Sequence, residues 1–234
     1  MTERSFFHKV GFYFSGKDHN NSLIATSCLK HIKDSDSILD GSRQQFAKLV
    51  TNMPVLPHQI AMKASPKPFE YAYQATTSEA TQVTAILDSV IKLKREIEPM
   101  LDLSNVAVLV GREIAITRGD GPIYNIMPLR RVQSLDHEQF MHHWYDRHAT
   151  LGESVEGVRY RQNHIDYGKT KELADHVDII FPEMDGLTES YFDSVEAAVN
   201  ILSQDSVAIG AIDDERLFID HARSQFGLYQ ILQD

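Results

Sequence analysis

Hydrophobic side chains alternate with polar or small ones in four short stretches of the first half of the chain, and this spacing predicts β-strands. The first stretch, residues 9–15, places valine and phenylalanine side chains on one face. Three more strands are predicted at residues 45–52, 70–76 and 106–116, the last of them bent near Gly111.

Two helices are predicted between these strands. Residues 21–32 form a short helix, and the polar residues 33–42, which include Gly41, form a loop. Residues 78–100 carry apolar side chains at helical spacing, with Ser78 as a candidate N-cap. The first half therefore has the element order β-α-β-β-α-β.

The sequence Arg-Gly-Asp-Gly-Pro at residues 118–122 is the strongest linker signal, because two glycines and a proline disfavour regular structure. It lies almost at the midpoint of the chain. Beyond it the pattern predicts strands at residues 124–132, 158–166, 186–192 and 226–233, and helices at residues 136–151 and 195–203. The order is again β-α-β-β-α-β, with the polar residues 167–176 as a connection.

Local signals refine the second half. Asp136 with Gln139, and Asp193 with Glu196, have the capping-box spacing that opens helices. Pro128 falls in the first strand of this half and removes a backbone donor. We therefore expect that strand to start late or to carry a bulge.

Each half matches the ferredoxin-like split βαβ unit, in which a four-stranded sheet buries one face under two helices and leaves the other face uncovered. Two such units in one chain can cover each other. The sequence therefore predicts an α+β protein in which two fused ferredoxin-like units, residues 1–118 and 119–234, pack sheet to sheet as a barrel. No residue-level repeat relates the halves, so we expect the first to be a diverged unit.

Charge separates the two halves. The formal net charge of the whole chain is −10, and the basic and acidic residues counted by halves give +2 for residues 1–118 and −12 for residues 119–234. The segment Glu172–Glu215 contains 12 carboxylates and no Lys or Arg. We interpret it as a solvated rim instead of a divalent-cation site, because it lacks the ligand spacing of a calcium loop. The acidic balance also argues against a nucleic-acid groove.

Other classes of protein are excluded by composition. Cys28 is the single cysteine, so an internal disulfide or a multi-cysteine metal site cannot form. No apolar run reaches the roughly 20 residues that span a bilayer, and no apolar signal segment follows Met1–Arg4. We therefore expect a cytoplasmic protein that binds neither membranes nor nucleic acids.

Candidate chemistry is concentrated on the first predicted helix of the second half. At about 100° per residue, His148 shares an apolar stripe with Trp144, and Tyr145 lies beside it. His142 and His143 point elsewhere, so no helix-borne metal pair is predicted. His148 is either a hydrogen-bonded core residue or a general acid/base in an apolar cavity. Trp144 is likewise either a core residue or a platform for substrate.

Polar residues also mark the next two strands. On the first of them Tyr160, Gln162 and His164 share a face, because side chains alternate, and this mixture is typical of a cavity wall. On the second, small residues are expected beneath the helices, which leaves Glu189 and Tyr191 to face the other sheet. The alternative role for Glu189 is that of an exposed edge carboxylate or of a member of an ion pair.

Five pieces of the second half occur in one order. They are Arg130-Arg131, Phe140-x3-Trp144-x3-His148-Ala149-x-Leu151, Tyr160-x-Gln162-Asn163-His164, Met184-Asp185-Gly186 and Asp213-Asp214-Glu215-x2-Phe218-x-Asp220. Together they resemble the EthD-like family over about residues 123–234. The resemblance implies the dimeric α+β barrel group, whose members usually pair ferredoxin-like units from two chains.

The resemblance also implies small-molecule chemistry without a metal or organic cofactor, as in decarboxylases, dehydratases, quinone-forming monooxygenases and muconolactone isomerases. The helix histidine of the family corresponds to His148, and its strand tyrosine and histidine correspond to Tyr160 and His164, so these three are the candidate catalytic residues. The candidate substrate-binding residues are Trp144, Tyr145, Gln162, Glu189 and Tyr191.

Two functions are consistent with these residues. The first is a cofactor-independent lyase, isomerase or monooxygenase-type enzyme that uses histidine acid/base chemistry on an apolar carbonyl or phenolic metabolite. The alternative is a non-catalytic protein that binds or delivers a hydrophobic intermediate of an oxidative degradation pathway. Haem held by one histidine, as in related duplicated barrels, is a third interpretation. The expected partners are a small apolar or aromatic ligand and, in a homodimer, a second copy of the chain.

Overall fold

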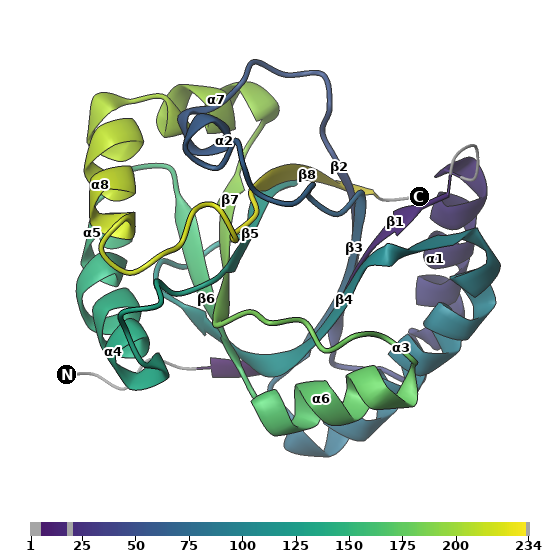
Figure 1. Ribbon diagram of the computed structural model, residues 1–234. Helices are drawn as coiled ribbons and strands as arrows, with labels where there is room; N and C mark the ends of the chain where they lie inside the picture. The colour runs from purple at the N-terminus through teal and green to yellow at the C-terminus, as the bar shows by residue number, and fades with distance from the viewer. Residues whose placement is uncertain (1–5, 18–20, 233–234) are drawn as a thin grey trace.

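The computed structural model describes residues 6–17 and 21–232, so Met1–Arg4 and Gln233, which the sequence predictions include, lie outside the described residues. Eight antiparallel strands of this part of the chain close into a barrel (Figure 1). Around the barrel they follow the order β1-β3-β2-β8-β5-β7-β6-β4. The strands are β1 (Phe6–Gly16), β2 (Arg43–Leu49), β3 (Tyr71–Thr77), β4 (Leu101–Ala115), β5 (Ile123–Leu129), β6 (Arg159–Ile165), β7 (Gly186–Phe192) and β8 (Gly227–Leu232).

Each half of the chain supplies four neighbouring strands of the barrel. The first half has the order β4-β1-β3-β2 and the second has β8-β5-β7-β6, which is the same arrangement of fourth, first, third and second strand. The two sets join where β2 pairs with β8 and where β4 pairs with β6. The predicted fold class is therefore confirmed: two ferredoxin-like sheets face each other within one polypeptide.

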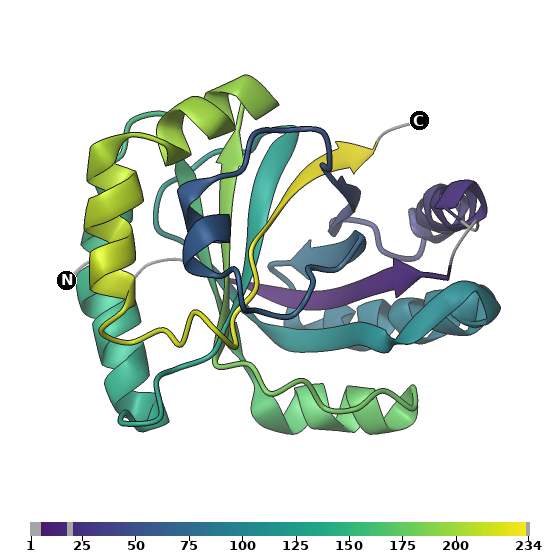
Figure 2. The same ribbon diagram turned by 45° about the horizontal axis from the view of Figure 1, so that its top comes forward.

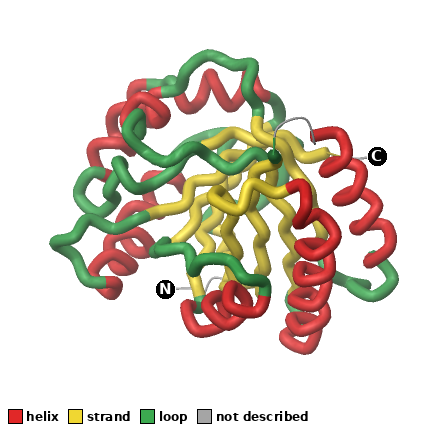
Figure 3. Tube along the Cα trace, turned by 45° about the vertical axis from the view of Figure 1, so that its right-hand side comes forward, coloured by secondary structure: helices red, strands yellow, loops and turns green. Residues whose placement is uncertain are grey.

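The helices lie outside the barrel in two groups (Figures 1 and 3). Beside the first-half strands lie α1 (Asn21–Ser35), α3 (Val83–Ile97) and α6 (Tyr167–His176). Beside the second-half strands lie α2 (Pro57–Ala61), α4 (His137–Met141), α5 (Ala149–Glu153), α7 (Val195–Leu202) and α8 (Ile212–Glu215). Each group encloses one apolar core, and a third apolar cluster lies inside the barrel. No helix in residues 6–17 and 21–232 is long and apolar enough to cross a membrane.

Two of these helices cross from one half of the chain to the other. α2 follows β2 of the first half, yet Leu56 and Met62 at its two ends belong to the apolar core of the second half. α6 follows β6 of the second half, yet its Leu173 and Ala174 belong to the core of the first half. In Figure 1 α2 accordingly lies beside α7, and α6 lies beside α3; Figure 2 shows the same two helices from a tilted view. Each half is thus partly covered by the other.

The predicted linker at residues 118–122 is the connection between β4 and β5, and it is tied to the end of the barrel. Asp120 accepts hydrogen bonds from Arg43 and Arg161, each at 2.5 Å. Gly119 has a φ of 121°, in the region that favours glycine. The junction between the halves is therefore an ordered part of the barrel rim.

Two predicted helix starts are wrong. Ser78 caps no helix, because the chain first forms a single 3₁₀ turn at Ala80–Gln82, and α3 begins only at Val83. Asp193 is not the N-cap of α7: its carboxylate instead pairs with Arg159 at 2.6 Å. Ser194 takes the capping role and accepts from the backbone N–H of residue 197.

Two features of the second half also differ from expectation. The polar residues 167–176 form α6, with Asp166 as its N-cap; little of its surface is buried, so the sequence shows no apolar period there. Pro128 neither delays nor bulges its strand, because β5 begins at Ile123 and keeps one register with β7. The Pro128 carbonyl accepts from Gln225, so the missing N–H lies on the β8 side, beyond the last β5–β8 pair.

Candidate active site

One helical rod in three segments carries the candidate histidine. It begins at Asp136, whose carboxylate accepts from the backbone N–H of Gln139 at 2.8 Å, as the capping-box spacing predicts. After α4 the chain forms a π-helix over His142–His148 and returns to an α-helix in α5. Phe140 and Trp144 are fully buried against the second-half sheet, so Trp144 has the core role.

The π-helix brings His143 and His148 to the same carboxylate. Nε2 of His143 lies 3.0 Å from Oδ1 of Asp214, and Nδ1 of His148 lies 2.7 Å from Oδ2. The prediction that His143 points away from His148 is wrong, because it assumed an α-helix, in which residues five apart lie about 140° apart. A π-helix bonds residues five apart, so these two imidazoles lie on one side.

Asp214 sets the proton position on His148. The hydrogen bond from His148 and the one from His143 hold the pKa of Asp214 below its usual range, although its partial burial acts in the other direction. An ionised carboxylate only accepts, so Nδ1 of His148 must donate to it. Nε2 is the other ring nitrogen, and it has no hydrogen-bond partner among the residues that the structure describes.

His148 lines a cavity of about 580 Å³ between the outer face of the second-half sheet and helices α5 and α7. The wall combines polar side chains with apolar ones, among them Met127, Val158, Phe192, Leu202 and Val207. Thr188 and Ser190 of β7 line it as well, and their small size leaves the space open. Gly186 of the same strand leaves room for the indole of Trp144, since a Cβ there would overlap the ring. The prediction that small residues lie beneath the helices is therefore correct.

The first half of the chain also contributes to this cavity, through His58 of α2. Nε2 of His58 lies 3.4 Å from Oε1 of Glu215, and Nε2 of His221 lies 3.0 Å from Oε2. Burial alone would raise the pKa of the Glu215 carboxyl, but the neighbouring His58 and His221 hold that pKa well below its usual range. Consecutive residues, Asp214 and Glu215, thus each hold a cavity-lining imidazole in place.

The face of β6 that carries Tyr160, Gln162 and His164 points outward, towards the helices. Tyr160 lines the cavity, but its hydroxyl accepts from Trp144 Nε1 at 3.0 Å and from Gln162 Nε2 at 2.9 Å. Burial raises the pKa of Tyr160 to about 12. His164 packs against the rings of Trp144 and Tyr145, and burial lowers its pKa to about 4, so its imidazole is neutral at pH 7. His148 and Tyr160 therefore share a cavity, whereas His164 of β6 and Tyr145 of the rod are not among its lining residues.

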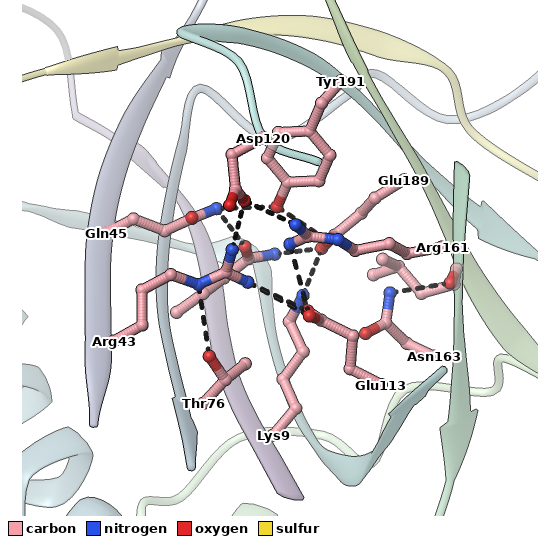
Figure 4. A network of polar contacts seen from close by, with 12 residues as sticks. Lys9, Arg43, Gln45, Thr76, Glu113, Asp120, Arg161, Asn163, Glu189 and Tyr191 are labelled. Carbon is pink, nitrogen blue, oxygen red and sulfur yellow. Dashed lines mark hydrogen bonds and ion pairs between the residues drawn. The ribbon is translucent and has the colours of Figure 1, made fainter. Parts of the chain in front are cut away.

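Glu189 and Tyr191 lie on the other face of β7, inside the barrel, as the alternation predicts (Figure 4). Oε1 of Glu189 accepts from Lys9 Nζ at 2.6 Å, and Oε2 accepts from the Tyr191 hydroxyl at 3.0 Å. Lys9 also donates to Glu113 at 2.9 Å. The structure does not bring this pair to the His148 cavity, and the ion-pair alternative describes the position of Glu189.

Figure 4 also shows that this interior network combines both halves of the chain. Glu113 of β4 pairs with Arg43 at 3.1 Å and with Arg161 of β6 at 3.2 Å. Burial would raise the pKa of Glu113, but the charges of Lys9, Arg161 and Arg43 lower it to about 2. The interpretation of Glu172–Glu215 as a solvated rim is wrong for its buried members, because Asp185, Glu189 and Glu215 each have cationic or imidazole partners within the fold.

The cavity does not fit haem well. An imidazole with a carboxylate partner is a suitable axial ligand, and His148 has that form. The lining, however, contains no Lys or Arg to pair with propionates, and it includes two acidic residues, Glu156 and Glu215. Among the described residues no three His, Cys, Asp or Glu side chains converge as a metal-binding group.

A closed barrel of two ferredoxin-like sheets, with a cavity beneath the helices of one of them, defines a protein of the dimeric α+β barrel class. Residues 133–222 match the model of the EthD domain, which confirms the resemblance predicted from the second half. No curated protein sequence matches the chain.

Solved structures support the same class. An anthrone oxidase-like protein is 10% identical with a TM-score of 0.53, over 99% of this chain and 93% of that one. A single-site variant of chlorite dismutase from Candidatus Nitrospira defluvii is also 10% identical, with a TM-score of 0.52 and the same coverage. At such low identity the likeness shows the fold alone, with this chain spanning both units of the barrel.

Three residues near His148, namely His58, Asp214 and Glu215, were not predicted from the sequence as site residues. Asp214 and Glu215 belong to a quoted piece of the resemblance, and that piece was the available signal for them. His58 has no comparable signal, because it lies among prolines in the half without the motif.

Proposed function

We propose that the chain is an enzyme that moves a proton on a small, largely apolar carbonyl or phenolic compound in the His148 cavity. The observation that supports the proposal is the hydrogen bond of 2.7 Å between Asp214 and His148, which orients the ring and leaves Nε2 as a base. A wall that combines apolar side chains with polar groups suits a compound with an aromatic or hydrocarbon body and a polar substituent. The likeness to an anthrone oxidase-like protein is in keeping with a cyclic ketone or phenol.

In the proposed step Nε2 of His148 takes a proton from a carbon next to a carbonyl, or from a phenol hydroxyl. The electron pair of the broken bond moves onto the substrate, giving an enolate or phenolate. The hydroxyls of Thr188 and Ser190 line the same cavity and are the candidates to donate to its oxygen. Proton transfer of this kind serves isomerisation, decarboxylation, dehydration and cofactor-free oxygenation, and it requires no cofactor.

The test uses anthrone, a ketone with acidic C–H bonds, as the probe in D₂O. The wild-type protein is expected to accelerate deuterium uptake, because His148 abstracts the proton. H148Q should lower this rate by about 10²-fold or more, the usual contribution of a general base. D214N should lower it less, because the ring remains but loses its orientation.

The control for this test is H176Q, which changes an exposed histidine at the end of α6 and should leave the rate unchanged. Circular dichroism establishes that each variant is folded. A folded H148Q protein with the full wild-type rate would remove the proton-transfer role.

The apolar side chains in the cavity wall also suit a second candidate, a protein that binds and delivers a hydrophobic intermediate without changing it. The two functions differ in stoichiometry. A carrier releases its ligand unchanged, whereas an enzyme forms product in molar excess over protein. Saturable binding of anthrone without deuterium uptake or product would favour the carrier.

A further inference from the structure

A second cavity, of about 720 Å³, is lined by the loops that follow β5 and precede β7 and β8. It shares no lining residue with the His148 cavity. Three arginines converge on it: Arg130 and Arg131 from the first quoted piece of the sequence, and Arg223. The proposed function uses none of them.

Two of these arginines are neutralised by the fold. Arg131 forms an ion pair with the buried Asp185, and Nε of Arg223 donates to Asp220 at 2.7 Å. Each of these guanidinium groups also donates to a backbone carbonyl. Their positions are therefore explained by contacts within the chain.

Arg130 differs from its two neighbours. Its guanidinium forms no hydrogen bond or ion pair with any residue that the structure describes, and its Nη1 atom is buried without a partner. Partial burial of the side chain also lowers the pKa of Arg130. A buried cationic donor without a partner is unfavourable in the free protein, and such a group is expected to be paired with a ligand.

An apolar groove of about 410 Å³ begins at the same arginine. The two spaces adjoin, because the groove and the arginine cavity share the lining residues Arg130, Phe181, Glu183, Met184 and Arg223. The groove includes large apolar side chains that are exposed: Leu103 is 54% exposed and Ile180 is 90% exposed. A single ligand can therefore contact the guanidinium and the apolar surface together.

We propose that Arg130 and this groove form a binding site for an apolar monocarboxylate, with the carboxylate on the Arg130 guanidinium and the hydrocarbon body in the groove. A planar carboxylate matches the donor fork of arginine and can accept two parallel hydrogen bonds. The carboxylates of Glu183 and Asp185, which line the same cavity, disfavour a dianion such as phosphate. The site is separate from the one at His148 and does not depend on the proposed reaction.

Calorimetric titration with sodium octanoate tests the proposal. The wild-type chain should bind one octanoate, and 1-octanol or inorganic phosphate at the same concentration and ionic strength should bind at least about tenfold more weakly. R130Q should weaken octanoate binding by about tenfold or more, because the charged hydrogen bonds are lost. L103D, at the exposed rim of the groove, should also weaken it.

Two further measurements separate this site from other causes. The melting temperature of ligand-free R130Q should stay close to that of the wild type, since the half-buried Arg130 guanidinium forms no hydrogen bond or ion pair with any described residue. R95Q, which removes an exposed arginine of α3, and H148Q should bind octanoate as the wild type does. Unchanged octanoate binding in folded R130Q, or a loss in H148Q instead, would overturn the proposal, as would equal affinity for phosphate.

Discussion

Buried charged side chains connect the two sheets inside the barrel. Lys9 of β1 is almost fully buried, and it lies between Glu113 of β4 and Glu189 of β7, so its partners come from both halves of the chain. Removing one member of such a network leaves an uncompensated charge in the interior. In the sequence, these polar interior residues look like substrate-binding residues. Only the ion pairs seen in the structure distinguish that role from a structural one.

Glu113 should make the free energy of unfolding decrease as the pH falls below about 5. Its folded-state pKa of about 2 lies below its ordinary value of 4.5, so its contribution is complete above that ordinary value. It is lost as the pH falls from there towards about 2, because the unfolded chain then binds the proton more tightly. E113Q should lower the free energy of unfolding at pH 7 by about 3–5 kcal/mol. It should also show a smaller further loss between about pH 5 and pH 3.

Urea unfolding at several pH values measures both effects. D88N changes an exposed carboxylate of α3 and should match the wild type within about 0.5 kcal/mol. An E113Q protein that loses as much stability in acid as the wild type would contradict this account of the carboxylate.

At the level of elements, helix α2 of the first half packs against the core of the second half and connects the two halves. Leu56 at its start is fully buried in the second-half core, and His58 reaches Glu215 beside the cavity. The helix has only five residues, so propensity alone would not hold it. Its stability must come from these contacts.

L56A should lower the free energy of unfolding by about 2–5 kcal/mol, the usual cost of truncating a buried leucine. I60A offers a matched control in the same helix, since Ile60 is 60% exposed, and it should change stability by less than about 0.5 kcal/mol. Urea denaturation followed by circular dichroism compares the two. Similar losses for both variants would mean that α2 does not pack as described.

The sequence predicted the elements whose side chains follow a regular period, and it missed those that depend on partners. The eight strands follow one another as predicted, and the inward direction of Glu189 is confirmed, because alternation alone determines it. The order β-α-β-β-α-β is incomplete, because α2 and α6, which lie between the second and third strands of their halves, were not predicted. The π-helix could not be predicted, since the hydrophobic period of a short amphipathic rod does not distinguish it from an α-helix. The positions of His143 and Asp214 depend on that segment, so the pairing with His148 was missed as well.

For the molecule as a whole, the closed barrel and the two exchanged helices should make the two halves unfold as one cooperative unit. Trp144, the single tryptophan, lies in the second-half core and reports on that half. Leu93 of α3 is fully buried in the first-half core. A change at Leu93 should therefore be sensed at Trp144, although the two residues belong to different cores.

L93A should shift the unfolding midpoint seen by Trp144 fluorescence as far as the midpoint seen by circular dichroism. The loss expected is about 2–5 kcal/mol. L23A, at an exposed position of α1, serves as the control and should shift neither probe. A fluorescence midpoint that keeps the wild-type value while the circular dichroism midpoint falls would show that the halves unfold separately.

The exchange of α2 and α6 has a consequence for chains cut at the junction. Each fragment would carry one helix whose apolar side chains pack only in the core of the other fragment. Neither piece could bury all of its own surface, and the complementary helices would select the correct mate over a second copy of the same piece. Cleavage in residues 118–122 would therefore yield two fragments that depend on each other to fold. If each fragment were fused to another protein, reassembly of the fragments would report that the two fusion partners interact.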